Sequence, residues 1–175
     1  RHALQGRRIW VAGSTHPGDE AAALAAMQAL NDPAWLLILA PRDIARAEQI
    51  AQTFTAAGMA AARRSLGQIP GPDCRVWLAD SYGEMGLWYR LAGVALVGGG
   101  FDAIGGHNPW EPARLGAAVL HGPDTANFSA DYAQLAAAGA ARMVRAGDLA
   151  GAVADDAANA AMAARAEAPV AQEIG

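Results

Sequence analysis

The chain has 175 residues, a formal charge of −4 at pH 7 and a sequence pI near 5.5. This length suits one domain with a substantial core, and the lack of a basic excess argues against general nucleic-acid binding. No apolar stretch approaches the roughly 20 residues of a membrane-spanning helix, and no signal peptide is visible. The single cysteine, Cys74, cannot form an internal disulfide and fits a reduced compartment.

The sequence starts without an initiator methionine and runs within a dozen residues into the apolar segment 8–13. We therefore expect an excised domain that occupies residues 1–175, with an alanine-rich helical tail over about 150–175 that packs or frays. Its function then depends on an amino-terminal half that is absent from this chain.

Short apolar runs alternate with longer segments of helical spacing, one through Leu24, Met27 and Leu30 and another from Ile44 to Phe54. This alternation is typical of parallel βαβ units. The nearly continuous apolar run 35–40 indicates a sheet buried on both faces. The sequence thus predicts an α/β fold with a Rossmann-like, doubly wound parallel sheet. The expected strands are 8–13, 35–40, 60–64, 75–79, 94–98, 117–120 and 141–145.

Polar and glycine-rich segments follow four of these strands. In doubly wound sheets, ligands bind beyond the carboxyl ends of the strands, near a topological switch point. The connections at the opposite edge, such as 31–34 and 57–59, carry little chemistry by comparison. We therefore predict one continuous site at the carboxyl edge. The segments that would form it are 13–20, 41–43, 80–84 and 98–112.

The segment 105–112 has the strongest signal. Asn108 as a cap and Pro109 at the first helical position predict a helix start directed at an anion, and the preceding glycines would let phosphate approach the backbone. Glu111, one turn into this helix, could accept hydrogen bonds from ribose hydroxyls. The alternative is a tight turn and a well-capped helix, in which Glu111 serves only the helix dipole.

Other polar residues have equally plain alternatives. Ser14 and Thr15 either contact a ligand or cap a helix that begins near Gly18. Arg42 either reaches a phosphate or is a solvated charge. Glu84 is interpreted as the dipole partner of the helix that follows it.

His16 and His107 are candidates for proton transfer, metal binding or hydrogen bonding. Neither has a second ligand at a helical metal spacing, so hydrogen bonding is the preferred role and no metal is expected. Trp88 and Tyr89 are predicted to lie in the core. Gly13 and Ser14 stand where the dinucleotide fingerprint would begin, which argues against NAD, and no nucleophile elbow, Walker loop or paired-cysteine site is present.

Seven segments, in this order over about residues 8–150, together resemble the carboxyl-terminal domain of the 3-deoxy-D-manno-octulosonic acid (Kdo) transferase family. Each is a weak signal alone, and their combination is specific. The segments are 13–16, 41–42, 80–89, 97–99, 105–112, 122–123 and 127–128.

The resemblance implies the carboxyl-terminal half of a GT-B glycosyltransferase that binds the donor CMP-Kdo. Such an enzyme is inverting, needs neither metal nor cofactor, and transfers Kdo to a lipid A precursor at the cytoplasmic face of the bacterial inner membrane. The catalytic base, the acceptor site and the membrane anchor would belong to the missing amino-terminal domain. No catalytic residue is therefore expected in this chain, which would be soluble and would bind CMP without catalysing transfer.

The resemblance also implies roles for individual residues. The start of the helix would hold a phosphate, and the loop after the first strand would give it a second contact. A carboxylate would bind the ribose. Two turns would frame the cytosine and the phosphate. The phosphate residues are Gly106, His107, Asn108 and Ser14; the ribose residue is Glu111; the framing residues are Pro41, Arg42, Tyr82 and Gly83.

Three positions depart from the family pattern: Pro17 replaces an acidic residue, and Asp43 and Asp124 stand where histidine is common. If either aspartate faced the donor carboxylate, affinity would fall. Two alternatives also stay open: another GT-B enzyme, such as a UDP-sugar transferase or a sugar-nucleotide epimerase, and a non-catalytic nucleotide-binding module.

Overall fold

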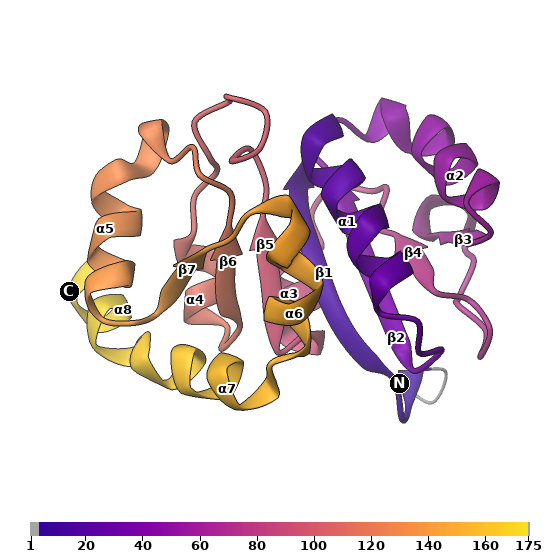
Figure 1. Ribbon diagram of the computed structural model, residues 1–175. Helices are drawn as coiled ribbons and strands as arrows, with labels where there is room; N and C mark the ends of the chain where they lie inside the picture. The colour runs from indigo at the N-terminus through magenta and orange to yellow at the C-terminus, as the bar shows by residue number, and fades with distance from the viewer. Residues whose placement is uncertain (1–3, 175) are drawn as a thin grey trace.

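A seven-stranded, fully parallel sheet forms the centre of the computed structural model, which describes residues 4–174 (Figure 1). The strand order is β3-β4-β2-β1-β5-β6-β7, so the predicted doubly wound α/β fold is confirmed. The strands are β1 (Arg8–Thr15), β2 (Trp35–Pro41), β3 (Ala61–Arg63), β4 (Val76–Leu78), β5 (Val94–Val97), β6 (Ala118–His121) and β7 (Ala141–Met143).

All seven strands lie where the apolar runs predicted them, with ends that differ by one or two residues. The largest extension is at β1, which continues to Thr15 through a register shift between Gly13 and Thr15. Ser14, inside that shift, has a left-handed backbone with φ of 52°. The irregularity marks the end of the strand at which the site was predicted.

Helices connect the strands, and both helical spacings in the first third of the sequence are confirmed. The tail forms three short helices instead of one, and Leu149, Val153 and Met162 bury it against the core. The helices are α1 (Pro17–Ala29), α2 (Ala47–Ala56), α3 (Met85–Leu91), α4 (Trp110–Arg114), α5 (Ser129–Ala137), α6 (Leu149–Ala154), α7 (Asp156–Arg165) and α8 (Glu167–Ile174).

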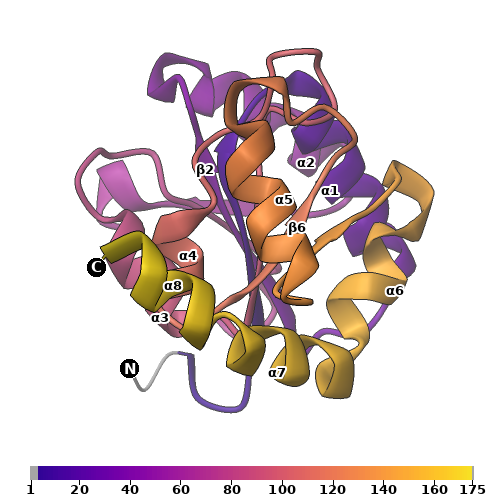
Figure 2. The same cartoon turned by 90° about the vertical axis from the view of Figure 1, so that its left-hand side faces the viewer.

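Two helical layers cover the sheet, because successive strand residues point to opposite faces. Trp10 and Leu37 pack with α1, α2 and α6 on one face, whereas Val11 and Ile38 pack with α3 on the other. Figure 2 shows α1 and α6 on one side of the strands and α3, α4 and α8 on the other. Burial on both faces explains the nearly unbroken apolar runs.

The chain changes direction across the sheet between β1 and β5. Strands β2 to β4 lie on one side of β1, and β5 to β7 lie on the other, so the connection from β4 to β5 creates a topological switch point. The two halves meet through three register pairs, of which the last joins Gly13 to Val97. The carboxyl ends of all strands lie along one edge, at the top of Figure 1.

Candidate functional site

The loop between β1 and α1 forms the centre of the carboxyl edge. His16 occupies the N-cap of α1, and Pro17 is the first helical residue, so the prediction that Ser14 or Thr15 caps this helix is wrong. The Thr15 hydroxyl instead donates to Glu20 at 2.8 Å. A serine held at positive φ stores backbone strain, and such strain is concentrated at functional sites.

The loop 98–109, after β5, packs directly on the β1–α1 loop. A Cβ on Gly98 would collide with the Ser14 carbonyl oxygen, and the Gly98 amide donates to the Gly13 carbonyl at 2.8 Å. Gly99 has φ of 90° and lies against Gly106. These glycines are required for the close approach of two backbones.

Two carboxylates join these loops, and sequence reasoning missed both of them. Asp19 is fully buried, and its Oδ2 accepts hydrogen bonds of 2.9 Å from the amides of His16 and Gly99. Within residues 4–174 its Oδ1 has no partner. Burial is the main reason why the pKa of Asp19 is raised. This carboxylate therefore orders the glycine turn against α1.

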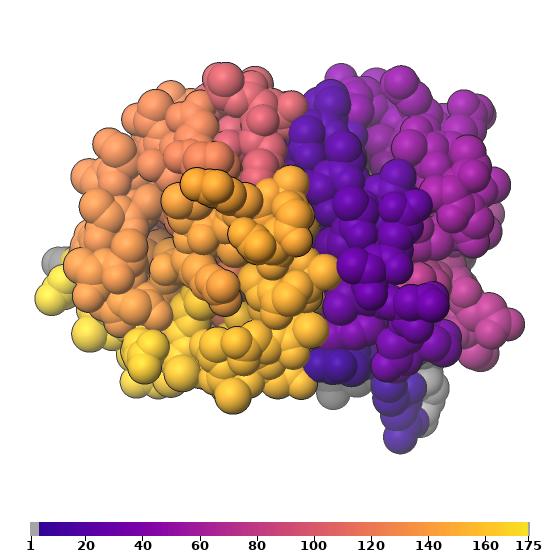
Figure 3. All heavy atoms as spheres, viewed as in Figure 1, coloured from indigo at the N-terminus to yellow at the C-terminus, as the bar shows by residue number. Residues whose placement is uncertain are grey.

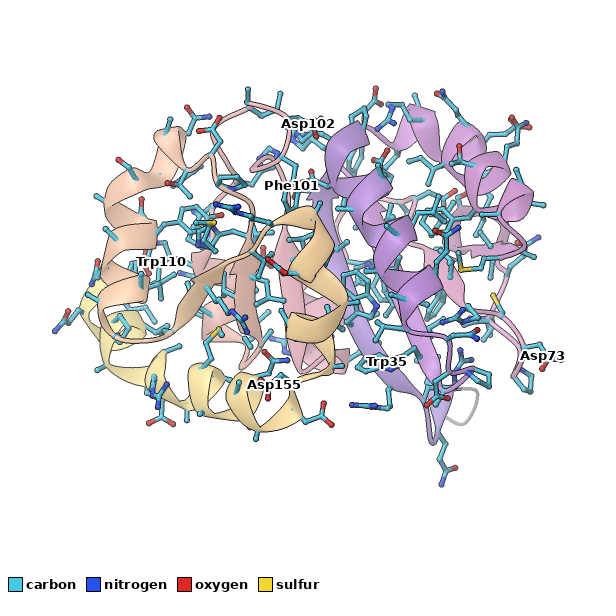
Figure 4. The ribbon with its side chains drawn as sticks, viewed as in Figure 1. Trp35, Asp73, Phe101, Asp102, Trp110 and Asp155 are labelled. Carbon is cyan, nitrogen blue, oxygen red and sulfur yellow. The ribbon has the colours of Figure 1, made fainter. Side chains whose placement is uncertain are left out.

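Asp102 makes the reciprocal contact from the loop 98–109. Both of its oxygens accept from the Gly18 amide, at 2.9 and 2.8 Å. Figure 4 shows Asp102 beside the start of α1, and Figure 3 shows the two segments in contact at the top of the molecule. The carboxylate occupies the place at the start of α1 where an anion would otherwise bind. The position of an acidic residue just after the triple glycine was the available signal.

A pair of histidines makes a third connection between the same loops. His16 Nε2 and His107 Nε2 lie 2.8 Å apart, the ring planes differ by 9°, and the centroids are 5.0 Å apart. The rings therefore meet nitrogen to nitrogen, in agreement with the predicted hydrogen-bonding role. Burial, followed by the charges of His16 and Arg42, lowers the pKa of His107.

The start of α4 differs from the prediction. The helix begins at Trp110, so Pro109 lies at the N-cap and not at the first helical position. Asn108 still accepts from the Trp110 amide at 2.9 Å. The amides of Gly106 and His107 donate to Gly99 and Gly98, and so they are already paired within the loop. Any anion held here would use side chains, because these two amides are occupied.

Glu111 is the second residue of α4 and is exposed. Its Oε1 lies 3.8 Å from the position that a Cβ on Gly86 would occupy, which places the carboxylate beside α3. Burial and the charge of Glu111 raise the pKa of Tyr89. The predicted core positions of Trp88 and Tyr89 are confirmed. Glu111 makes no ion pair among the described residues.

Five residues predicted from three separate segments line one cavity of about 180 Å³ at this edge. Tyr82 is 66% exposed, and its hydroxyl lies 3.4 Å from the Arg42 carbonyl oxygen. The Arg42 guanidinium is exposed and has no ion-pair partner within residues 4–174. The residues from the prediction are Ser14, Pro41, Arg42, Tyr82 and Gly83.

The turn that carries Tyr82 begins at a buried carboxylate. Asp80 accepts from Arg63 Nε at 2.9 Å and from the Ser65 amide and hydroxyl at 2.8 and 2.6 Å. Burial opposes the ionisation of Asp80, but these hydrogen bonds outweigh it and lower its pKa. The loop after β3 therefore fixes one wall of the cavity.

Glu84 lies at the N-cap of α3, where the helix dipole favours a negative charge. Its carboxylate also pairs with Arg64 at 2.9 Å and accepts from the Ser81 hydroxyl at 3.1 Å. The bond from Arg64 lowers the pKa of Glu84. The predicted dipole role was therefore incomplete, because this side chain also links two loops.

Two of the three departures from the family pattern, Asp43 and Asp124, have local explanations. Asp43 accepts from the Ala45 amide at 3.0 Å, and Asp124 accepts from the Ala126 amide at 3.1 Å. Each carboxylate thus caps the turn that follows it. Within residues 4–174, no cluster of three or more metal-ligating side chains occurs, and no helix has the length and apolarity to cross a bilayer.

The opposite edge of the sheet is less bland than predicted. A cavity of about 310 Å³ lies there, lined among others by Arg8, Trp35, Asp156 and Asn159. Arg8 pairs with Asp156 at 2.7 Å and lies 4.1 Å above the Trp35 ring. The two charges named here are therefore already paired, and Asn159 Nδ2 donates to the carbonyls of Ala152 and Val153, whereas its buried Oδ1 has no partner within residues 4–174.

Comparison with known proteins gives a consistent relationship. No protein-family model matches the chain. A 3-deoxy-D-manno-octulosonic acid transferase of Bordetella pertussis is 41% identical over 142 residues, which are 78% of this chain and 33% of the relative. The chain thus spans about one third of the length of the curated relatives that it matches.

Solved structures agree. The C-terminal CMP-Kdo binding domain of WaaA from Acinetobacter baumannii is 30% identical, with a TM-score of 0.88 over 97% of this chain and 91% of that chain. WaaG, a glycosyltransferase involved in lipopolysaccharide biosynthesis, has a TM-score of 0.59 at 13% identity and 44% coverage of that chain, which shows the fold alone. The sheet has the Rossmann-like α/β fold that these structures share. The chain belongs to the 3-deoxy-D-manno-octulosonic acid transferase family.

Proposed function

We propose that this chain is the donor-binding domain of a glycosyltransferase that transfers Kdo from CMP-Kdo to a lipid A precursor. The observation that carries the proposal is the likeness, over nearly the whole of both chains, to a domain described as binding CMP-Kdo. The convergence of the predicted residues at one edge of the sheet supports it independently.

The cavity beside Arg42 is the proposed place for cytosine and part of the phosphate. Arg42 offers an exposed guanidinium that has no ion-pair partner among residues 4–174, and a guanidinium can bind phosphate oxygens in a bidentate manner. Tyr82 presents an exposed aromatic face at the mouth of the same cavity, and a pyrimidine can stack on such a face. Pro41, which has no backbone N–H, and Gly83, which has no side chain, complete the walls.

The remaining contacts come from the loops that meet at the switch point. The side chains of Ser14, His107 and Asn108 are proposed to bind the phosphate, in place of the paired amides of Gly106 and His107. Gly106 is proposed to contribute by having no side chain, which lets the loop pack closely against Asp124 and Tyr132. Glu111 is exposed and has no ion-pair partner within the described part of the chain, so its carboxylate can accept hydrogen bonds from both hydroxyls of a ribose.

This arrangement suits the departure of CMP. As the bond between the sugar and the phosphate breaks, negative charge grows on the phosphate, and fixed donors stabilise that charge. Arg42 and the neighbouring side chains would do so without a metal or a cofactor. The catalytic base, the acceptor site and the membrane contact are proposed to lie outside this chain, in an enzyme that acts at the cytoplasmic face of the inner membrane.

Base preference tests this proposal against its rivals. Calorimetric titration of the chain with CMP, UMP, AMP and inorganic phosphate is expected to give the tightest binding for CMP, and both Glu111→Ala and Asn108→Ala are expected to weaken it. Tighter binding of UMP would instead indicate a UDP-sugar enzyme. Equal binding of all nucleotides, or none, would overturn the proposal in favour of a different module.

A further inference from the structure

The hydrogen bond between His16 and His107 restricts the protons that these two side chains can hold. With Nε2 facing Nε2 at 2.8 Å, one nitrogen must donate and the other must accept. The donor ring, if neutral, has a bare Nδ1, whereas the acceptor ring carries its proton on Nδ1. One additional proton can therefore bind to the bare Nδ1 without breaking the contact. A second additional proton would protonate the Nε2 atom that accepts the hydrogen bond. Both Nε2 atoms would then be donors, and the rings would separate.

The surroundings decide which ring takes that proton. Asp19 lies beside His16, since its Oδ2 accepts from the His16 amide, and Asp102 is bound to the next turn of the same loop. On the other side, the positive charge of Arg42 acts on His107, and the Tyr132 hydroxyl donates to the His107 carbonyl at 2.6 Å. Negative groups thus flank His16, and a cation flanks His107.

We propose that His16 joins His107 as one phosphate-binding pair, and that His16 takes up a single proton from solvent at Nδ1 when the donor's phosphate binds. The inference rests on the proposed function. An anion placed among Arg42, Ser14 and His107 neutralises the charge that opposes protonation of the pair. The proton adds a second positive charge to the site, and no residue has to move to supply it.

Counting protons during CMP binding tests the pair. Calorimetry at pH 7.5, in two buffers of different ionisation enthalpy, is expected to show an uptake approaching one proton for each CMP bound. At that pH the phosphate of CMP is mostly in its dianionic form, because its second pKa is about 6. Above the apparent pKa of the pair, the affinity for CMP is expected to fall about tenfold per pH unit.

Matched variants separate this role from simple packing. His16→Gln keeps a polar group at the contact but cannot titrate, and it is expected to abolish the uptake. His107→Gln leaves His16 able to take up the proton but removes a phosphate donor, and it is expected to weaken CMP binding. His121→Gln is the control, because His121 is a buried histidine whose Nδ1 bonds to Gly122 at 2.8 Å and whose ring packs on Tyr132, whereas the rings of the pair pack on each other. Cytidine, which lacks the phosphate, is expected to bind without proton uptake.

The outcomes distinguish this inference from the proposed function. If CMP binds selectively but proton uptake is the same in His16→Gln as in the unmodified chain, the proposed role of His16 is refuted. The proposed function would still stand. If no nucleotide binds selectively, sulfate provides an anion that does not titrate. Nitrogen-15 NMR of the imidazoles would then have to show protonation of His16 on addition of sulfate, and an unchanged spectrum would refute the pair.

Discussion

The two edges of the sheet contain cavities of opposite character. The amino edge has the larger one, about 310 Å³ against about 180 Å³ at the carboxyl edge. At the amino edge, Arg8 is paired with Asp156 and stacked on Trp35. At the carboxyl edge, Arg42 and Glu111 are exposed and have no ion-pair partner among the described residues. Unpaired polar groups, more than volume, distinguish a ligand site from a packing defect.

The largest expected effect concerns the two ends of β5. Gly98→Val places a side chain against the Ser14 carbonyl, in a space that has no room for it, and is expected to destabilise the protein by about 3 kcal/mol. Gly93→Ala, at the other end of the strand, meets nothing within 4 Å and is expected to change stability by less than about 0.5 kcal/mol. Urea denaturation measures both. Equal effects would show that the two edges are equally packed.

The second prediction concerns the arginines. Arg42→Ala is expected to weaken CMP binding by about 2 kcal/mol, roughly thirtyfold, because a charge-assisted contact is lost, and to leave the unfolding free energy nearly unchanged. Arg8→Ala is expected to do the opposite, since this side chain packs on Trp35. Calorimetry measures CMP binding by both variants, and denaturation measures their stability. Weaker CMP binding by Arg8→Ala would contradict the difference between the two edges.

The third prediction concerns pH and stability. The folded-state pKa of Asp80 lies below its value in the unfolded chain, so its contribution to stability is full above about pH 5 and is lost as pH falls through about 3.9 toward the lower folded value. Asp80→Asn is expected to remove about 1.5 kcal/mol at pH 7 and to flatten this acid dependence.

The control for Asp80 is Asp156→Asn at the amino edge, where the carboxylate is 76% exposed and its ion pair contributes little. Denaturation at pH 7, 5 and 3 compares the two variants. The comparison would fail if Asp156→Asn lost as much stability as Asp80→Asn.

The smallest effect concerns ribose. Glu111→Gln is expected to reduce the preference for CMP over deoxy-CMP by about 1 kcal/mol, because a charged acceptor for the hydroxyls is removed. Glu173→Gln provides a control on the neighbouring helix α8, since Glu173 pairs with Arg114 of α4 at 2.9 Å. A preference that persisted in Glu111→Gln would assign the ribose to another residue.

The fold could be predicted because its signals are local. A strand that is buried on both faces needs a continuous run of apolar residues, and such a run is visible without knowledge of its neighbours in space. The prediction of β2 was therefore correct to within one residue. Turn residues at strand ends also indicated which segments meet at the carboxyl edge, where five of the predicted residues line one cavity. Local patterns therefore identified the sheet and the elements around it.

The details of the site depend on partners that are distant in sequence. Asp19 binds an amide 80 residues away, and the two histidines lie 91 residues apart. No spacing rule joins such residues. The sequence also contains no sign that the amides of Gly106 and His107 are paired within the loop, because their acceptors are the carbonyls of Gly99 and Gly98.

The pairing of β1 with β5 also determines when in folding a ligand can first bind. β1 and β2 come together through a short connection, whereas Gly13 must find Val97 across most of the preceding chain. Contacts of such long range form slowly. In a partly folded chain whose two halves have not joined, the loops of the carboxyl edge are not assembled. A nucleotide that binds at this edge would therefore stabilise only the fully folded state.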